Sequence, residues 1–172
     1  MKNWDYRNSG AYFITINTKN RYHYFGEVKN GKKNLSHIGI IADIMWYEIK
    51  NHSKNIDLGE YVIMPDHVHG ILILKDRKDD IVKVVACNGS TADKERNKNQ
   101  HMSSISPKPD SISTIIRSYK SAVTKHAHRL GFEFQWQSKF HDHIIRDEKA
   151  FENITTYIKN NPANWEKDNI PE

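Results

Sequence analysis

The alternation of apolar and polar side chains divides the chain into strands and helices. Period-two runs predict strands, and recurrences at three and four residues predict helices. Strands are expected at residues 11–18, 59–63, 68–74 and 140–146, with a short partner strand at 22–25 and a loop at 29–33. Helices are expected from Ser36 to near Asn51, from Ser111 to Leu130, and from Glu148 to Pro162, where proline stops the last one.

The order of these elements indicates a fold class. Strand, helix, strand, strand, helix and strand, followed by an extra helix, is the order of an α+β, ferredoxin-like (RRM-like) fold. A four-stranded antiparallel sheet then carries helices on one face, with the C-terminal helix as an addition. The polar stretch at about 76–110 predicts a mobile insertion in a single domain over residues 1–172. Many unrelated activities use this fold, so it implies no function by itself.

Composition narrows the class of protein. The 172 residues are 37% hydrophobic and 27% charged, which is typical of one soluble globular domain. No apolar run approaches the roughly 18 residues of a membrane helix, and the N-terminus lacks a signal-peptide core, so a cytoplasmic protein is expected. The single Cys87 excludes an internal disulfide. A net charge of +5 modestly favours a polyanionic partner.

Candidate metal chemistry lies in the apolar run that contains His67 and His69. Successive side chains of a strand point to opposite faces, so these two imidazoles share one face and are able to hold one metal ion. The alternative is a pair of histidines on a half-exposed strand with no ligand. The spacing is not unique, because His141 and His143 repeat it among more polar neighbours.

Two residues of the last predicted helix complement this pair. Tyr157 and Asn161 lie four apart and therefore share a helix face. If that helix crosses the histidines, Asn161 offers an amide oxygen as a third ligand and Tyr157 a phenolic nucleophile. Two imidazoles and an amide oxygen suit Mg²⁺ or Mn²⁺, although the imidazoles alone would also accept Zn²⁺. Tyr119 on the preceding helix is the chief rival nucleophile, and a structural role in the core is the alternative for either tyrosine.

Basic and aromatic residues suggest contacts with nucleic acid. Arg117 and Lys120 lie off the apolar stripe of the second helix, where they either follow a DNA backbone or form an ordinary solvated face. Trp136 is expected either to stack on a base or to pack at the rim of the core.

Several motifs, in order along residues 10 to 165, resemble one family. They are Met64-Pro65-Asp66-His67-Val68-His69, Trp136-Gln137, His143-Ile144-Ile145-Arg146, and the segment from Tyr157 to Asn161-Pro162. Together they resemble the HUH single-tyrosine transposases, and in particular the REP-associated tyrosine transposase branch.

The resemblance implies a metal-dependent transposase. His67, His69 and Asn161 would bind the ion, and Tyr157 would attack single-stranded DNA near a hairpin, giving a 5′-phosphotyrosine and a free 3′-hydroxyl. Arg146 would join the DNA contacts. It also implies a monomer rather than a dimer, acting on nucleoid DNA in the cytoplasm.

Two other functions fit parts of the pattern. One is a non-catalytic single-stranded nucleic-acid-binding module that uses the same sheet. The other is a metal-dependent phosphoesterase that activates water instead of Tyr157 and forms no covalent adduct.

Overall fold

The computed structural model describes residues 9–75 and 111–168, so the insertion expected at 76–110 lies outside the described residues. The elements are β1 (Gly10–Asn17), the 3₁₀ turn η1 (Lys19–Arg21), β2 (Gly26–Lys29), β3 (Lys32–Leu35), α1 (His37–His52), β4 (Ile56–Ile63), β5 (His67–Leu74), α3 (Ile112–Arg129), β6 (His141–Ile145) and α4 (Glu148–Asp168). No helix in the described residues has the length and apolar composition that crossing a membrane requires.

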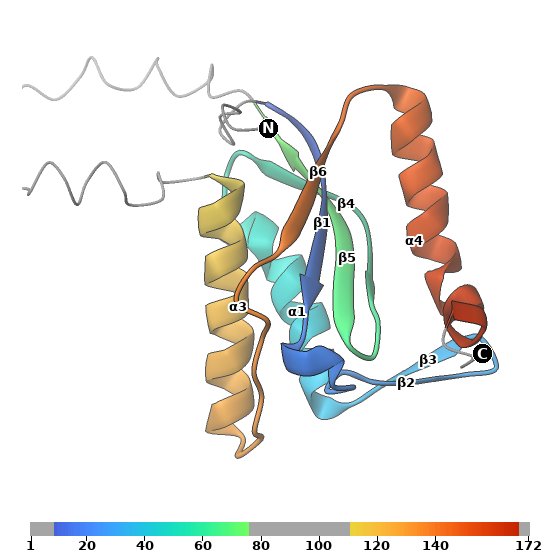
Figure 1. The fold of residues 1–172 in the computed structure, drawn as a ribbon. Helices are drawn as coiled ribbons and strands as arrows, with labels where there is room; N and C mark the ends of the chain where they lie inside the picture. The colour runs from blue at the N-terminus through green and yellow to red at the C-terminus, as the bar shows by residue number, and fades with distance from the viewer. Residues whose placement is uncertain (1–8, 76–110, 169–172) are drawn as a thin grey trace, which may run out of the picture.

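The main sheet confirms the predicted fold class. Its four strands run in the order β4-β5-β1-β6, and each neighbouring pair is antiparallel (Figure 1). The two central strands are β1, which is the first strand expected from the sequence, and β5, which is the third. A separate hairpin of β2 and β3 lies outside this sheet.

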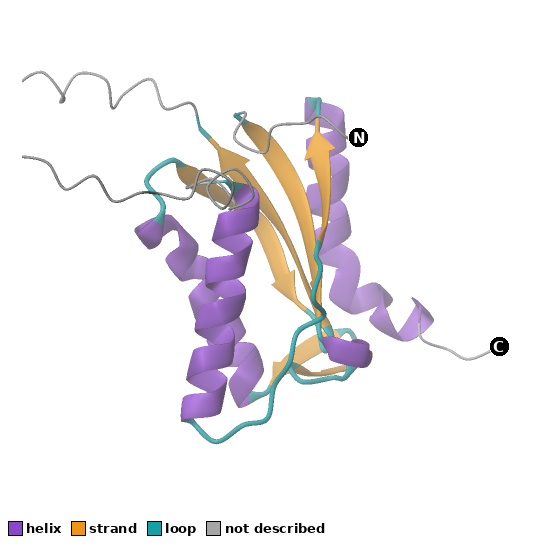
Figure 2. Cartoon of the chain, turned by 60° about the vertical axis from the view of Figure 1, so that its left-hand side comes forward, coloured by secondary structure: helices purple, strands orange, loops and turns teal. Residues whose placement is uncertain are grey.

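Alternation along the strands gives each face of the sheet its own apolar core. Tyr12, Ile14 and Ile16 of β1 are fully buried in the core shared with α1 and α3. Phe13 points the other way, into the core beneath α4. Figure 2 shows the result, with α1 and α3 on one side of the sheet and α4 on the other. The extra helix therefore covers the face that a ferredoxin-like plan leaves open.

Gly70 lets α1 approach the sheet closely. A Cβ atom at Gly70 would lie 2.2 Å from Cζ2 of Trp46, which is itself fully buried. We expect Gly70→Ala to lower the free energy of unfolding by about 1–3 kcal/mol or more, because neither the indole nor the strand has room to move. Urea denaturation measures this loss. Ser118→Ala, an exposed change on α3, is the control and is expected to stay within about 0.5 kcal/mol.

The prediction for residues 22–25 was wrong. These residues form no strand, and the hairpin instead spans Gly26 to Leu35, with Lys29 pairing with Lys32. Asn30 and Gly31 make the turn with φ angles of 52° and 69°, the left-handed geometry that an Asn-Gly pair favours in a two-residue hairpin. The segment at 29–33 is therefore a strand turn rather than an open loop.

The prediction that Pro162 ends the last helix was also wrong, because α4 continues through it to Asp168. Proline removes one backbone donor and usually breaks a helix, but packing beyond it outweighs that cost here. Ala163 lies against Gly31 of the hairpin, and the ring of Trp165 packs against those of His23 and His67. Trp165 consequently belongs to the helix, beyond the end predicted at Pro162.

The other predicted helix limits agree with the structure. The side chain of Ser36 accepts a hydrogen bond from the amide of Gly39 at the start of α1, and the carboxylate of Asp147 accepts one from the amide of Ala150 at the start of α4. These caps satisfy amides that have no partner within the helix, which fixes where each helix begins.

Candidate functional site: a histidine pair beneath the last helix

Strand β5 holds His67 and His69 on the face of the sheet that α4 covers. Their ring centroids lie 4.3 Å apart, and the two residues are only 5% and 7% exposed. The residues opposite them on β1 are Asn17 and Thr15. Because β5 is a central strand, the backbone cannot shift without breaking pairing on both sides, so the two imidazoles are held rigidly.

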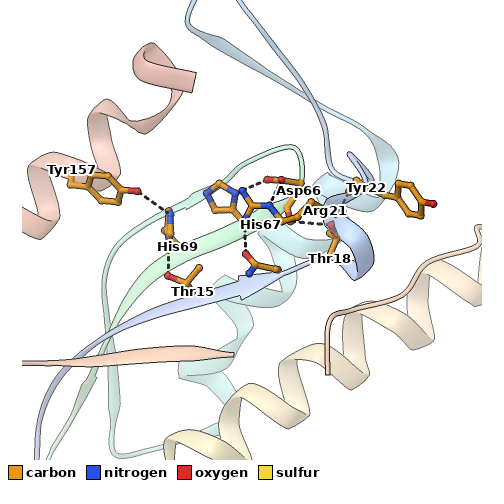
Figure 3. A network of polar contacts seen from close by, with 9 residues as sticks. Thr15, Thr18, Arg21, Tyr22, Asp66, His67, His69 and Tyr157 are labelled. Atoms are coloured by element: carbon orange, nitrogen blue, oxygen red, sulfur yellow. Dashed lines mark hydrogen bonds and ion pairs between the residues drawn. The ribbon is translucent and has the colours of Figure 1, made fainter. Parts of the chain in front are cut away.

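Each imidazole is oriented by a hydrogen bond to its Nδ1 atom (Figure 3). Nδ1 of His67 lies 2.6 Å from a carboxylate oxygen of Asp66, and Nδ1 of His69 lies 2.9 Å from the hydroxyl of Thr15. Both Nε2 atoms are therefore the ones available to a ligand. Nε2 of His67 is buried and has no hydrogen-bond partner among the described residues. A buried nitrogen of this kind, with its other ring nitrogen on a carboxylate, is the usual arrangement of a metal-binding histidine.

Burial keeps His69 in its neutral form. Loss of water around the ring, followed by electrostatic interaction with His67 and Arg21, lowers the pKa of His69 to about 3. The ring is therefore unprotonated at neutral pH. Its lone pair is then available to a metal ion or to a proton donor.

Helix α4 presents one face to the pair. Tyr157, Asn161 and Trp165 lie four residues apart on this face. The phenolic oxygen of Tyr157 is 3.4 Å from Nε2 of His69, and the ring of Trp165 is 5.9 Å from that of His67. Asn161 lies between these two contacts and is 8% exposed. The structure thus brings the predicted nucleophile, Tyr157, to His69 and places Asn161, the predicted third ligand, on the same face of α4.

Tyr157 is the accessible member of this group. It is 50% exposed, whereas its ring still packs edge-on against Phe13 at 6.2 Å. The rival Tyr119 is 3% exposed, donates its hydroxyl to the backbone of Ala42, and has a pKa raised well above its usual value by burial. Of these two tyrosines, Tyr157 is therefore the one that a large substrate is able to reach.

The donors fit a divalent metal ion. The described residues contain no group of three or more His, Cys, Asp or Glu side chains placed to hold a metal ion. A site here would therefore consist of the two Nε2 atoms of His67 and His69, with the amide oxygen of Asn161 as the further protein ligand. The orphaned Nε2 of His67 is the observation that supports such a site.

The second His-x-His sequence lies on the same face but in a different environment. Strand β6 places His141 opposite Thr15 and His143 opposite Phe13. Both histidines are exposed on an edge strand. The repeated spacing therefore gives one buried, oriented pair and one solvated pair.

The four predicted DNA-contact residues lie away from the histidine pair. Arg117 is exposed on α3, behind the sheet, and Arg146 is exposed just after β6. Lys120 donates from Nζ to the carbonyls of Gln137 and Ser138, and burial lowers its pKa. Trp136 is half-buried against Phe25 and Phe134 at the rim of the core. Their contact with DNA remains a prediction.

Sequence reasoning missed the role of Arg21. Nε of Arg21 lies 2.6 Å from the second carboxylate oxygen of Asp66, and Nη1 donates to the side chain of Asn17. Asp66 therefore links Arg21 to His67. The neighbouring Asp66 was a visible signal, because a carboxylate beside a candidate metal ligand often orients it. Nothing in the local pattern around Arg21 pointed to this site.

Comparison with known proteins finds a relative by sequence and a solved structure of the same fold. No family model matches it. An uncharacterised protein of Haemophilus influenzae is 34% identical over 171 residues, covering 99% of this chain and 89% of that protein. The solved structure of a REP-associated tyrosine transposase bound to a REP hairpin is 21% identical, covers 95% of this chain and 72% of that one, and superimposes with a TM-score of 0.59. The chain therefore belongs to the family of the Haemophilus influenzae protein, and its fold is that of the HUH tyrosine transposases.

Proposed function

We propose that the protein is a transposase that cleaves and rejoins single-stranded DNA near hairpins, with Tyr157 as the nucleophile. The observation that carries the proposal is the half-exposed phenol of Tyr157, 3.4 Å from Nε2 of a buried, neutral histidine. A structural tyrosine would bury its hydroxyl against a fixed partner, as Tyr119 does. Tyr157 instead is half-exposed, and its oxygen lies on the Nε2 side of His69.

The proposed reaction exchanges one phosphodiester for another. The oxygen of Tyr157 forms a bond to phosphorus, and the bond from phosphorus to the 3′-oxygen of the upstream nucleotide breaks. The downstream strand is then a 5′-phosphotyrosine. The phenolic proton is balanced by the proton on the released 3′-hydroxyl, so the step needs no oxidant, reductant or energy-rich co-substrate.

We assign a resident Mg²⁺ or Mn²⁺ to His67, His69 and Asn161. When bound, such an ion polarises the phosphate and stabilises the negative charge that develops on it. The protein itself orients the proposed ligands and the nucleophile. Asp66 and Thr15 fix the two rings through their Nδ1 atoms, and α4 sets Asn161 and Tyr157 one turn apart on the same face.

The proposed substrate is single-stranded DNA that contains a hairpin. The net charge of +5 favours a polyanion, and the transposase of the same fold was solved with a REP hairpin. A single strand has unpaired bases and a flexible backbone, so its phosphates are free to approach the site beside Tyr157. We propose a monomer acting on nucleoid DNA as the working form.

Incubation with labelled single-stranded hairpins tests this function. We expect a protein–DNA adduct on a denaturing gel with Mg²⁺ or Mn²⁺ and none with EDTA. Metal-dependent cleavage without an adduct would instead establish a water-using phosphoesterase. Binding without cleavage, across a broad pool of hairpins, would establish a non-catalytic single-strand binder.

Asp66 is expected to raise the metal affinity of the site through its hydrogen bond to His67, without contacting the ion itself. Asp66→Asn keeps a hydrogen bond to His67 but removes the negative charge behind the ring, so we expect Mn²⁺ affinity to fall by about 10–100-fold. Titration calorimetry measures the change. Asp57→Asn is the matched control, because that carboxylate pairs with Lys75 at the other end of the sheet. An equal affinity in the two variants would contradict the assignment of His67 as a ligand.

A further inference from the structure

A polar cleft lies at the end of β1, and one residue that lines it, Arg21, is bound to Asp66 beside His67. Its volume is about 470 Å³, within the range of small-ligand sites. It lies between η1, which contributes Lys19 and Arg21, and the segment before β6, which contributes the residues Gln135, Trp136, Gln137 and Ser138. These side chains offer two cations, several hydrogen-bonding groups and one aromatic ring, which is the chemistry that binds a nucleotide of a single strand.

The two walls of the cleft are joined through their backbones. The amide of Lys19 donates to the carbonyl of Gln135, and the amide of Gln137 donates to that of Asn17, both at 3.0 Å. Nζ of Lys19 also donates to the side chain of Gln135 at 2.6 Å. The cleft is therefore part of the fold and not a gap between independent loops.

The backbone of η1 is strained where it forms the cleft. Asn20 and Arg21 have φ angles of 54° and 56°, in the left-handed region that residues with a Cβ rarely occupy. Two such residues in succession persist only when surrounding contacts hold them, and such strain gathers at functional sites. The effect here is to direct the side chain of Arg21 back toward Asp66 and Asn17.

Arg21 joins the cleft to the histidine pair. Its Nε is bound to Asp66, whose carboxylate is buried and also contacts His67. Even so, the side chain of Arg21 is 53% exposed, so part of the guanidinium faces solvent at the cleft. Because Arg21 offsets the charge of Asp66, the carboxylate does not repel an anion at this position.

Tyr157 lies on the opposite side of the pair. Figure 3 shows Tyr157 beside His69 at one end of the site, and His67, Asp66 and Arg21 toward the other, with the two histidine rings 4.3 Å apart. In phosphoryl transfer the attacking and leaving oxygens lie roughly in line with phosphorus. If the phosphate sits at the histidines and Tyr157 attacks from its side, the leaving 3′-oxygen departs toward Arg21 and the cleft.

We infer that this cleft binds the nucleotide on the 5′ side of the cut, the one that keeps the 3′-hydroxyl, and that Arg21 contacts the phosphate of that nucleotide. The inference rests on the proposed function and adds to it a binding site and a strand polarity. In the cleavage step the bond from phosphorus to Tyr157 forms, the bond to the 3′-oxygen breaks, and the nucleotide bearing the new 3′-hydroxyl remains in the cleft.

Binding in EDTA tests the cleft without any cleavage. We expect Arg21→Gln and Lys19→Gln each to weaken binding of a short labelled single strand of mixed sequence by about tenfold, the scale of a lost charge-assisted hydrogen bond. Lys54→Gln, an exposed change near the start of β4, is expected to bind like the wild type. Lys19 does not contact Asp66 in the structure, so its variant tests the cleft even if Arg21→Gln unfolds. Equal affinity in all three variants would overturn the inference, whether or not the protein cleaves DNA.

Neutral methylphosphonate linkages test the polarity. Once the cut is mapped, one substrate carries the neutral linkage one nucleotide 5′ of the cut and another carries it one nucleotide 3′ of the cut. We expect the neutral linkage on the 5′ side to lower the cleavage rate of the wild type and of Lys54→Gln by about tenfold. It should have no further effect on Arg21→Gln, which has already lost that contact.

The outcomes separate this inference from the proposed function. If Arg21→Gln retains the full sensitivity to the 5′ linkage, or loses sensitivity to the 3′ linkage instead, the assignment is overturned while Tyr157 chemistry stands. If the wild type forms no adduct on any hairpin, the proposed function fails. The binding comparison in EDTA then still decides whether the cleft is a phosphate site.

Discussion

The Tyr157→Phe variant is expected to form no covalent adduct and to lose cleavage by at least about 10³-fold, because it removes the attacking oxygen and nothing else. The ring contacts with Phe13 and His69 are made by the aromatic carbons and remain in place. Removing the hydroxyl takes away its 3.4 Å contact with Nε2 of the buried His69, so the free energy of unfolding is expected to fall by no more than about 1–3 kcal/mol. Single-strand binding should stay at the wild-type value.

Denaturing gels with labelled hairpin DNA measure both products of the reaction. Tyr47→Phe is the matched control, because Tyr47 is 52% exposed on α1 and lies away from the histidine pair. It should form adduct like the wild type. If Tyr157→Phe cleaves at an unchanged rate, a water molecule is the nucleophile and the transposase mechanism is wrong.

The His67→Ala and His69→Ala variants are expected to lose metal binding and to slow cleavage by more than about 10²-fold, the scale of several kcal/mol of transition-state stabilisation. Two imidazoles supply most of the proposed protein ligands, so one alone cannot retain the ion. Calorimetry or the spectrum of bound Mn²⁺ follows the site directly, without relying on catalysis.

The chain contains its own control for this experiment. His141→Ala and His143→Ala remove the same spacing from the exposed strand β6, where no carboxylate or hydroxyl in the described structure is shown to orient the rings. These variants should bind Mn²⁺ like the wild type. Loss of the metal from His141→Ala or His143→Ala, with retention in His67→Ala, would move the site to β6.

The fold and the central part of the site were predictable because both depend on local periodicity. The apolar run at residues 68–74 predicted β5, and the spacing of two within a strand predicted the shared face of His67 and His69. The spacing of four between Tyr157 and Asn161 fixed their common helix face. Knowing that α4 lies over this part of the sheet then required only the order of the elements and the resemblance to the transposase family.

The rest depended on contacts between distant segments. Arg21 reaches Asp66 only because two successive left-handed residues turn the chain, and no short pattern predicts that conformation. Pro162 is helical because the residues after it pack against segments that are distant in the sequence. Ala163 lies against Gly31 of the hairpin, and Trp165 lies against His67 of β5. Local propensity gives the wrong answer at such positions, because tertiary packing outweighs it.

The placement of the cleft and Tyr157 on opposite sides of the histidines has a consequence for the fate of the cut DNA. The bond to tyrosine stores the energy of the broken phosphodiester, so a 3′-end that stays in the cleft is already aligned to reseal the strand. Joining to a different 3′-end requires the first to leave and another to occupy the same place. In the proposed reaction, the residence time of the 3′-end beside Arg21 therefore decides between repair of the original strand and its rearrangement.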